Sequence, residues 1–336
     1  MNDYIKIMIL YFLAVGFVYG IVGEINIKYE GIVSEEIPNH NLTYNNNIIA
    51  SLRVAGIKTE CPVEPEYKCE FHTLPMFAVF NGILYFIINS PYSYLILNLS
   101  FGFGAFLIFY TITKSYKLTL VFLLIPEFII LTLLPQQESY LLFFTLLPLW
   151  LIKKEKYNSA MIFSSASILA RAILIIPIAF LFYLIINKKF KISHLIYPII
   201  FGMLFLSYYA YFYNDYFYYF KTQAYLFTGT DKTTPNLLVF VQCYTYLFLS
   251  IFGVFLIKRN YNIKDIELIL PAAMLIFYLS IVGLYPHIFS NSFRYFFTIL
   301  PFVLPGFKKI IDKLFKYLLP PQALLWFLRV MFALKW

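Results

Sequence analysis

Long apolar stretches recur along almost the whole chain, and short polar segments separate them. Such stretches are typical of transmembrane helices, because a helix of about 20 apolar residues crosses the hydrocarbon core with its backbone hydrogen bonds made internally. The stretches lack the apolar–polar alternation of membrane-spanning strands. The pattern predicts an all-α fold, a polytopic transmembrane bundle of about nine to eleven helices that forms a single membrane domain over the whole chain.

Composition and charge agree with this pattern. The 336 residues are 61% hydrophobic and 13% charged, which excludes an ordinary soluble domain. The net charge of +9 does not indicate a nucleic-acid partner, because the basic residues form short clusters between apolar stretches. By the positive-inside rule these clusters are predicted to be cytoplasmic. They lie at 114–117, 153–156, 188–191, 258–264 and 308–316.

The first apolar stretch, 5–22, is predicted to be a retained helix with a cytoplasmic N-terminus, in a multi-pass protein of the plasma membrane or an ER-equivalent membrane. The polar segment 23–73 follows it and is predicted to be an external loop. Cys61 and Cys69 share this loop, where a disulfide and two unlinked thiols both remain open. The stretch 318–336 is predicted to be a C-terminal hydrophobic helix that spans the membrane or lies along its interface.

Two regions leave alternatives in the path of the chain. Residues 158–186 are interpreted as a hairpin of two short helices with Arg171 near its turn, and one long tilted helix is the competing interpretation. Residues 74–113 contain two apolar stretches, although the charge rule requires an odd number of crossings there. Either one stretch is interfacial or re-entrant, or the cluster at 114–117 is external.

Several polar residues are expected to gather on the external face. Ionisable side chains at membrane depth usually face a cavity, a partner or a substrate. A carboxylate can accept a proton from an attacking hydroxyl, and an arginine can bind a phosphate through paired hydrogen bonds. The candidate catalytic residues are Glu24, Glu30 and Glu138, and the candidate substrate-binding residues are Gln137, Arg171 and Arg294.

Each candidate also has a purely structural interpretation. Glu138 can be a first-turn residue that the helix dipole favours, and Arg171 can be a structural partner of a carboxylate or of free carbonyls. Arg294 can anchor a helix at the interface, and the loop glutamates can be solvated surface residues. The four histidines show no metal-ligand spacing, and no nucleotide-binding motif is present, so neither a metal nor another cofactor is expected.

Four short motifs carry a family resemblance: Phe-His-Thr-Leu-Pro-Met-Phe at 71–77, Pro-Gln-Gln-Glu-Ser-Tyr at 135–140, Ala-Ser-Ile-Leu-Ala-Arg at 166–171, and Arg294 ahead of Pro301. Together they resemble the GT-C superfamily of membrane glycosyltransferases, most closely the GPI mannosyltransferase II type. The Trp-Asp box of that family is not kept. Tyr44 and Asn45 stand in its place, so either a glutamate takes over as the base or the protein is not catalytic in that way.

The resemblance implies an inverting transferase that moves a sugar, such as mannose, from a polyprenyl- or dolichyl-phosphate donor to a lipid-linked or protein acceptor on the external leaflet. Membrane lipids, and a membrane-protein partner, are the further partners expected. Two alternatives stay open. One is a non-catalytic GT-C-like subunit that scaffolds a partner enzyme, and the other is a lipid or solute transporter.

Overall fold

The structure is a computed structural model that describes residues 3–30, 42–56, 74–89, 93–134, 136–221, 237–284 and 293–333. Regular secondary structure in these ranges is helical throughout, with no strand among them. The chain divides into two compact units. Unit 1 comprises Met1–Phe143 and Leu314–Trp336, and unit 2 comprises Phe144–Lys313.

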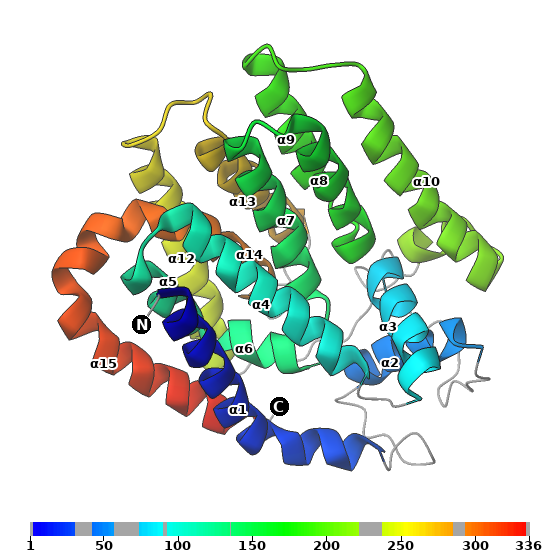
Figure 1. Ribbon diagram of the computed structural model, residues 1–336, viewed down its shortest axis with the longest axis horizontal. Helices are drawn as coiled ribbons and strands as arrows, with labels where there is room; N and C mark the ends of the chain where they lie inside the picture. The colour runs from blue at the N-terminus through cyan, green and yellow to red at the C-terminus, as the bar shows by residue number, and fades with distance from the viewer. Residues whose placement is uncertain are drawn as a thin grey trace. The chain divides into compact units, whose positions relative to one another are not determined.

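Unit 1 is built from the N-terminal helices and the end of the last one (Figure 1). Helix α1 contacts α4, α5 and α6, whereas α2 contacts α3, and α3 contacts α4. The helices are α1 (Asp3–Glu30), α2 (Leu42–Val54), α3 (Pro75–Ile88), α4 (Ser93–Thr113), α5 (Tyr116–Leu123), α6 (Pro126–Leu133), the start of α7 (Glu138–Lys153) and the end of α15 (Lys308–Ala333).

Local sequence explains where these helices begin and end. Lys114 has a φ of 50° just after α4, and the Ser115 side chain accepts a hydrogen bond from Leu118 N at the start of α5. Pro126 occupies the first turn of α6, where its missing N–H leaves no intrahelical bond unmade. Because α5 and α6 are bent by 58° at this break, one apolar run becomes two short helices.

An aromatic cluster fills the space between α1, α4, α5 and α6. The Tyr11 ring lies 5.5 Å from the Phe106 ring and 6.2 Å from the Phe128 ring, centroid to centroid. Gly102 lets α4 approach closely, since a Cβ there would lie 2.8 Å from the Tyr11 hydroxyl oxygen and from Thr132 Cγ2. The core of unit 1 is therefore tightly packed around α4.

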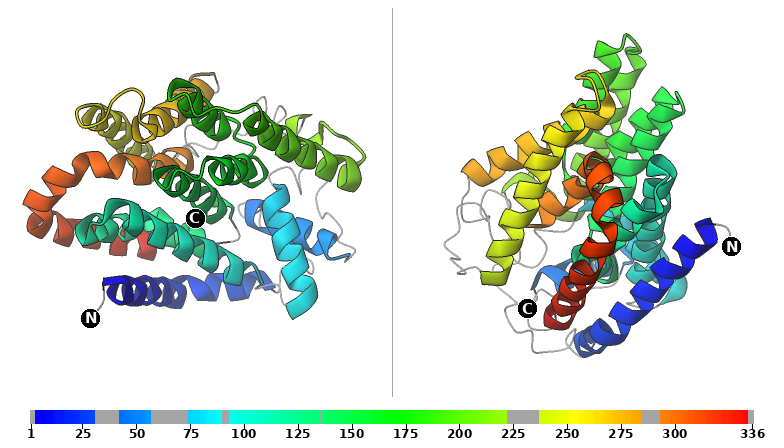
Figure 2. Two further views of the ribbon diagram at one scale, coloured as in Figure 1. Left: turned by 45° about the horizontal axis from the view of Figure 1, so that its top comes forward. Right: turned by 90° about the vertical axis from the view of Figure 1, so that its left-hand side faces the viewer.

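Unit 2 contains the remaining helices. Helix α8 contacts α9 and α10, α9 contacts α13, and α12, α13 and α14 contact one another (Figure 2). A Cβ at Gly253 of α12 would lie 2.5 Å from Val303 Cβ, so a glycine permits this close contact. The elements are the end of α7, α8 (Tyr157–Arg171), α9 (Ile175–Ile186), α10 (Ser193–Tyr213), α12 (Leu237–Lys258), α13 (Ile266–Leu284), α14 (Phe293–Val303), the 3₁₀-helix η5 (Leu304–Phe307) and the start of α15.

Three turns of unit 2 that carry lysine clusters share one end of the unit. Lys153 Nζ, at the end of α7, lies 2.9 Å from Glu267 Oε1 at the start of α13. Asn187 Nδ2, after α9, donates to the carbonyl oxygen of Lys264 at 2.9 Å. The clusters at 153–156, 188–191 and 258–264 therefore lie together, as the charge pattern predicts. Which side of a membrane they face stays a prediction.

Three helices are long and apolar enough to cross a membrane, and the bent pair α5–α6 gives a fourth if it forms one span. The three windows are Asp3–Gly20, Ser93–Thr113 and Ser193–Tyr213. The prediction of an all-α fold is confirmed for the described residues, and these apolar helices are consistent with a helical membrane protein. The described residues form more and shorter helices than the nine to eleven expected, because breaks such as the one before Pro126 divide apolar runs.

The structure decides one of the open alternatives and modifies other expectations. Residues 157–186 form the hairpin, not a single helix, because α8 and α9 are separate, in contact, and joined at Ala172, which has a φ of 53°. Residues 75–113 form one short apolar helix, α3, and one candidate span, α4. In the expected loop 23–73, α1 continues to Glu30 and α2 forms. Cys61 and Cys69 lie outside the described residues.

The C-terminal helix also differs from the expected segment. Helix α15 begins at Lys308 and continues through Pro320 and Pro321 to Ala333. The two consecutive prolines remove two N–H donors, yet the helix continues on either side of them. Contacts within unit 1 hold this part: Gln322 Nε2 donates to the carbonyl oxygen of Val121 at 3.2 Å, and the Trp326 ring stacks on Phe17.

Candidate functional site

The break between α6 and α7 buries four consecutive polar residues inside unit 1. Leu134 is extended at the end of α6, Gln136 N bonds back to the Leu134 carbonyl oxygen at 2.7 Å, and Glu138 begins α7. Gln137 is 5% exposed and Glu138 is 1% exposed, and Gln136 and Ser139 are also buried. Buried polar side chains need specific partners, so this break is a site that the rest of unit 1 is built to accommodate.

Side chains of α2, α4 and α6 contact this break. Asn98 Nδ2, on α4, donates to the carbonyl oxygens of Leu134 at 2.7 Å and Gln136 at 3.2 Å. Gln137 Nε2 donates to Asn47 Oδ1 of α2 at 3.3 Å. Ser139 Oγ donates to Thr132 Oγ1 of α6 at 3.2 Å. We call these residues, with Glu138, the buried polar network.

The network continues one turn along α7 to a small cavity. Asn81 Nδ2, on α3, donates to the Tyr140 hydroxyl oxygen at 3.1 Å, and Ser93 Oγ lies 3.5 Å from the Asn81 carbonyl oxygen. Asn81 Oδ1 is buried and has no hydrogen-bond partner in the described part of the chain. The cavity has a volume of about 10 Å³, enough for about one water molecule, and Asn81, Ser51 and Ser93 are among its lining residues.

Close helix packing fixes one wall of this cavity. A Cβ at Gly82 of α3 would lie 2.7 Å from the carbonyl oxygen of Ser51 on α2. Ser51 Oγ in turn donates to the Asn47 carbonyl oxygen at 2.8 Å within α2. The same two helices therefore hold Asn47 against Gln137 and Asn81 against Tyr140.

The candidate residues from the sequence lie in different parts of the fold. Gln137 and Glu138 are adjacent members of the buried polar network. Glu24 and Glu30 lie in the last turns of α1, where the structure describes the backbone and not these side chains. The structure thus brings Gln137 and Glu138 together, and it does not describe a contact of either with Glu24 or Glu30.

The two arginines belong to unit 2. Arg171 is the last residue of α8 and is partly exposed. Arg294 lies in the first turn of α14, and its side chain is outside the described residues. Both occupy helix ends, the position at which a long cationic side chain in a membrane protein can reach the headgroup region.

Sequence reasoning missed the asparagines that complete the network: Asn47, Asn81 and Asn98. Asn81 and Asn98 each interrupt an apolar helix, and a lone amide at membrane depth is a usable signal for a functional or structural polar contact. Asn47 gives no such signal, because it lies among polar residues in a segment expected to be a loop. Only its position on α2 buries it.

The described residues contain no group of three or more His, Cys, Asp and Glu side chains that could hold a metal ion. A scan against models of protein families and searches of curated proteins and of solved structures found no match to the chain. The arguments about function therefore depend on the chemistry of the chain itself.

Proposed function

We propose that this protein is a membrane glycosyltransferase that moves a sugar from a polyprenyl- or dolichyl-phosphate donor to a lipid-linked or protein acceptor on the external leaflet. The supporting observation is the burial of Glu138 in a polar network within an apolar helical unit. Removing a carboxylate from water costs several kcal/mol unless other groups compensate. Such a cost is more often found at a functional site than in an inert core.

In the proposed reaction, Glu138 accepts the proton of the acceptor hydroxyl as its oxygen attacks the anomeric carbon of the sugar. The bond from that carbon to the phosphate oxygen breaks, and its electron pair leaves with the lipid phosphate. Attack opposite to the leaving group inverts the configuration at the carbon. Glu24 and Glu30 are the alternative bases if Glu138 serves only to position the acceptor.

The other candidates take supporting roles in this proposal. Arg171 and Arg294 of unit 2 remain the candidate phosphate-binding residues, since a guanidinium can bind two phosphate oxygens at once. Gln137, fixed by Asn47, presents its amide oxygen to a sugar hydroxyl. No cofactor takes part, and the membrane orientation is the one with a cytoplasmic N-terminus.

A second candidate is a non-catalytic subunit that scaffolds a partner enzyme in the membrane. The observation in its favour is that Asn98, Gln137 and Ser139 form hydrogen bonds to groups of unit 1 itself. Such a network between helices can serve to fix a unique helix arrangement.

Transfer by purified protein in lipid nanodiscs, supplied with dolichyl-phosphate mannose and a lipid-linked acceptor, separates the two candidates. The Glu138→Gln variant is expected to lose about 10²- to 10⁴-fold in rate, because an amide cannot accept the proton. Glu127→Gln is the matched control, since Glu127 is also a buried carboxylate in the first turn of a unit 1 helix, and it should keep its rate. Equal losses in both variants would contradict the role given to Glu138, and an inactive parent protein would favour the scaffold.

A further inference from the structure

A second polar site lies at the lysine-rich end of unit 2. The turn before α8 and the turn between α9 and α10 surround a cavity of about 320 Å³. This volume is at the lower end of the range of small-ligand pockets. We call it the basic pocket, and it is lined by Glu155, Lys156, Tyr157, Asn158, Ser159, Lys189, Lys191 and His194.

The lining of the basic pocket is strongly cationic. Three lysines, Lys156, Lys189 and Lys191, face one carboxylate, Glu155. None of the three is ion-paired with a carboxylate in the described ranges, whereas nearby Lys153 is paired with Glu267. Ammonium groups gathered around a concave surface raise the local concentration of anions.

Hydrogen bonds around His194 give the pocket a fixed wall. His194 is 1% exposed, and its Nδ1 accepts a hydrogen bond from Lys191 N at 3.0 Å. Its Nε2 therefore carries the proton and donates to Asn158 Oδ1 at 2.8 Å. This bond ties the first turn of α10 to the first turn of α8, and it leaves the Asn158 amide nitrogen to donate to a ligand.

Neutral donors add to the charge of the lysines. Ser159 contributes a hydroxyl to the lining, and no side chain caps the N-terminus of α8, where Lys156 is the capping residue. The first amide groups of α8 thus add their partial positive charge to the same cavity. Lys189 Nζ lies 5.9 Å from the centroid of the Tyr157 ring, so one ammonium group lies close to the first residue of α8.

We propose that the basic pocket binds a phosphate monoester, and that its source is the headgroup of an anionic membrane lipid. Three ammonium groups with amide and hydroxyl donors match a dianionic group that has three acceptor oxygens. Apolar surface adjoins the pocket: Ile192, next to Lys191, is 81% exposed, and Leu195 and Ile196 follow on the exposed side of α10. A lipid can place its headgroup in the pocket and its chains along this surface.

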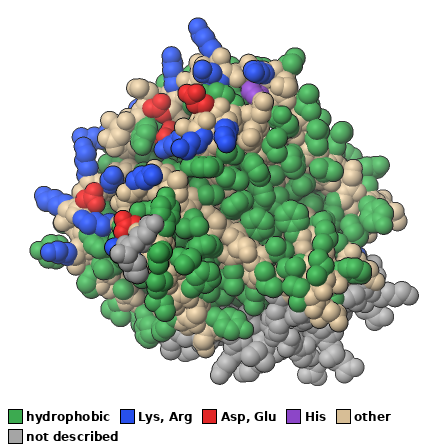
Figure 3. Space-filling model, viewed as in Figure 1, with side chains coloured by type: hydrophobic (Ala, Val, Ile, Leu, Met, Phe, Trp, Pro, Cys, Tyr) green, Lys and Arg blue, Asp and Glu red, His purple; other side chains and the backbone are tan. Residues whose placement is uncertain are grey.

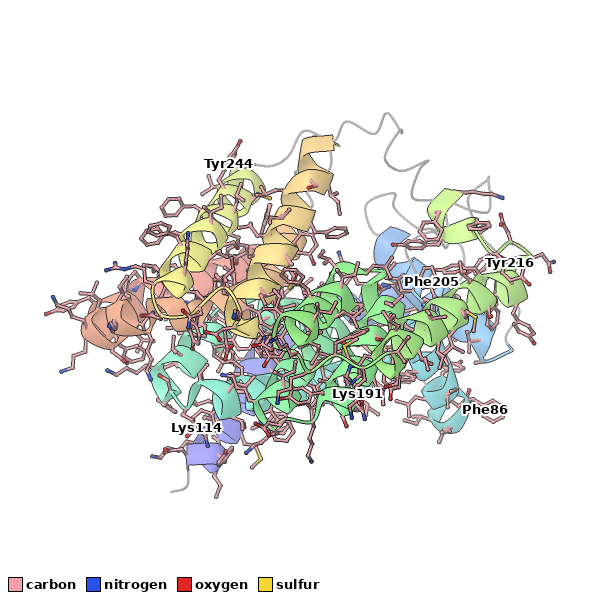
Figure 4. The ribbon with its side chains drawn as sticks, turned by 90° about the horizontal axis from the view of Figure 1, so that it is seen from above. Phe86, Lys114, Lys191, Phe205, Tyr216 and Tyr244 are labelled. Atoms are coloured by element: carbon pink, nitrogen blue, oxygen red, sulfur yellow. The ribbon has the colours of Figure 1, made fainter. Side chains whose placement is uncertain are left out.

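Within unit 2, the basic pocket lies away from Arg171, a candidate substrate-binding residue. Within α8, Arg171 lies at the opposite end, about 21 Å away at 1.5 Å per residue. Figure 4 shows Lys191 before α10, with Tyr216 beyond the far end of that helix. In Figure 3, blue lysine and arginine side chains lie around the purple histidine atoms near the top of the view. The proposal does not depend on the proposed transferase function.

Native mass spectrometry of the full chain in detergent tests the proposal with three probes: short-chain phosphatidic acid, short-chain phosphatidylcholine and inorganic phosphate. Phosphatidic acid is expected to bind, and phosphatidylcholine, whose phosphate is a diester in a zwitterionic headgroup, is expected to bind at least about tenfold more weakly. Tight binding of inorganic phosphate alone would support the phosphate site and assign it to a soluble ligand. Binding of neither phosphate monoester nor inorganic phosphate would overturn the proposal.

Matched variants separate the pocket from general charge. Lys189→Ala with Lys191→Ala is expected to weaken phosphatidic acid binding about tenfold or more. Lys258→Ala with Lys264→Ala makes the same change of charge at the same end of unit 2 outside the pocket lining, and should have little effect. Glu155→Gln should tighten binding, because it removes the carboxylate from the lining. Equal losses in the two double variants would show non-specific attraction and overturn the proposal.

Discussion

Unit 1 and unit 2 place their polar side chains in opposite ways. In unit 1, three asparagines, two glutamines and Glu138 are buried where helices break or cross. In unit 2, the lysines lie at helix ends around the basic pocket, and most buried polar residues are serines. Two of these, Ser164 and Ser167, bond to carbonyl oxygens three residues earlier in α8.

This difference shows two ways in which an apolar helical protein can carry polar groups. A serine hydroxyl that donates to a carbonyl oxygen of its own helix does not constrain the position of a neighbouring helix. An amide that donates to another helix, as Asn98 and Gln137 do, requires that helix in one position. Buried amides thus link helices of unit 1, whereas in unit 2 the buried serines of α8 bond within their own helix and close apolar packing at Gly253 joins α12 to α14.

The largest expected effect concerns the two ends of unit 2. Tyr216, which is 59% exposed, and Glu155, also exposed, lie at the two ends that the charge pattern assigns to opposite sides of a membrane. In a cysteine-free background, Tyr216→Cys should react with an impermeant thiol reagent in intact cells, and Glu155→Cys only after permeabilisation. The reverse pattern would invert the proposed orientation.

Overpacking unit 2 should have the next largest effect. A Cβ at Gly253 would meet Val303 Cβ at 2.5 Å and Phe307 Cε2 at 2.9 Å, and the stiff side chain of Val303 cannot easily move away. Gly253→Ala is expected to lower the free energy of unfolding by about 1–3 kcal/mol, measured by denaturation in mixed micelles. Gly202→Ala is the control, because nothing lies within 4 Å of its Cβ position. An unchanged free energy of unfolding in Gly253→Ala would show that close packing at this glycine does not stabilise unit 2.

The smallest expected effect is a difference in stability between variants of two asparagines, each of which donates to two carbonyl oxygens. Asn98 Nδ2 donates to two carbonyl oxygens inside unit 1, and Asn187 Nδ2 donates to two near the surface of unit 2, those of Tyr183 and Lys264. Asn98→Leu should cost about 1–2 kcal/mol of unfolding free energy, because it removes a buried donor from both carbonyls. Asn187→Leu should cost less, since water can replace its bonds. Equal losses of unfolding free energy in the two variants would show that burial does not make the Asn98 hydrogen bonds more stabilising than those of Asn187.

Local sequence signals predicted much of the helical architecture. The apolar runs indicated a helical membrane protein, and the position of Arg171 within 158–186 indicated a hairpin that the structure contains as α8 and α9. The shared end of three lysine clusters in unit 2 also followed from charge pattern. These features depend on residues close together in the chain, where spacing carries the information.

The buried polar network could be predicted only in part. Gln137 and Glu138 were noticeable because they follow an apolar run, but the Asn47 partner of Gln137 is 90 residues away in sequence. Helix α2 contains three consecutive asparagines, which have weak helix propensity, so its packing on α3 outweighs its local preference. Contacts of that kind leave no periodic pattern in a single sequence.

The bend between α5 and α6 limits how this region could cross a membrane. Each helix has eight residues, about 12 Å, far short of the roughly 30 Å that lipid requires of a spanning segment. Backbone hydrogen bonds at the break, from Leu124 N to Leu120 O and from Ile125 N to Phe122 O, satisfy two of its N–H groups without water. Neither helix could therefore cross a membrane alone, and the bent pair counts as one candidate span or as none.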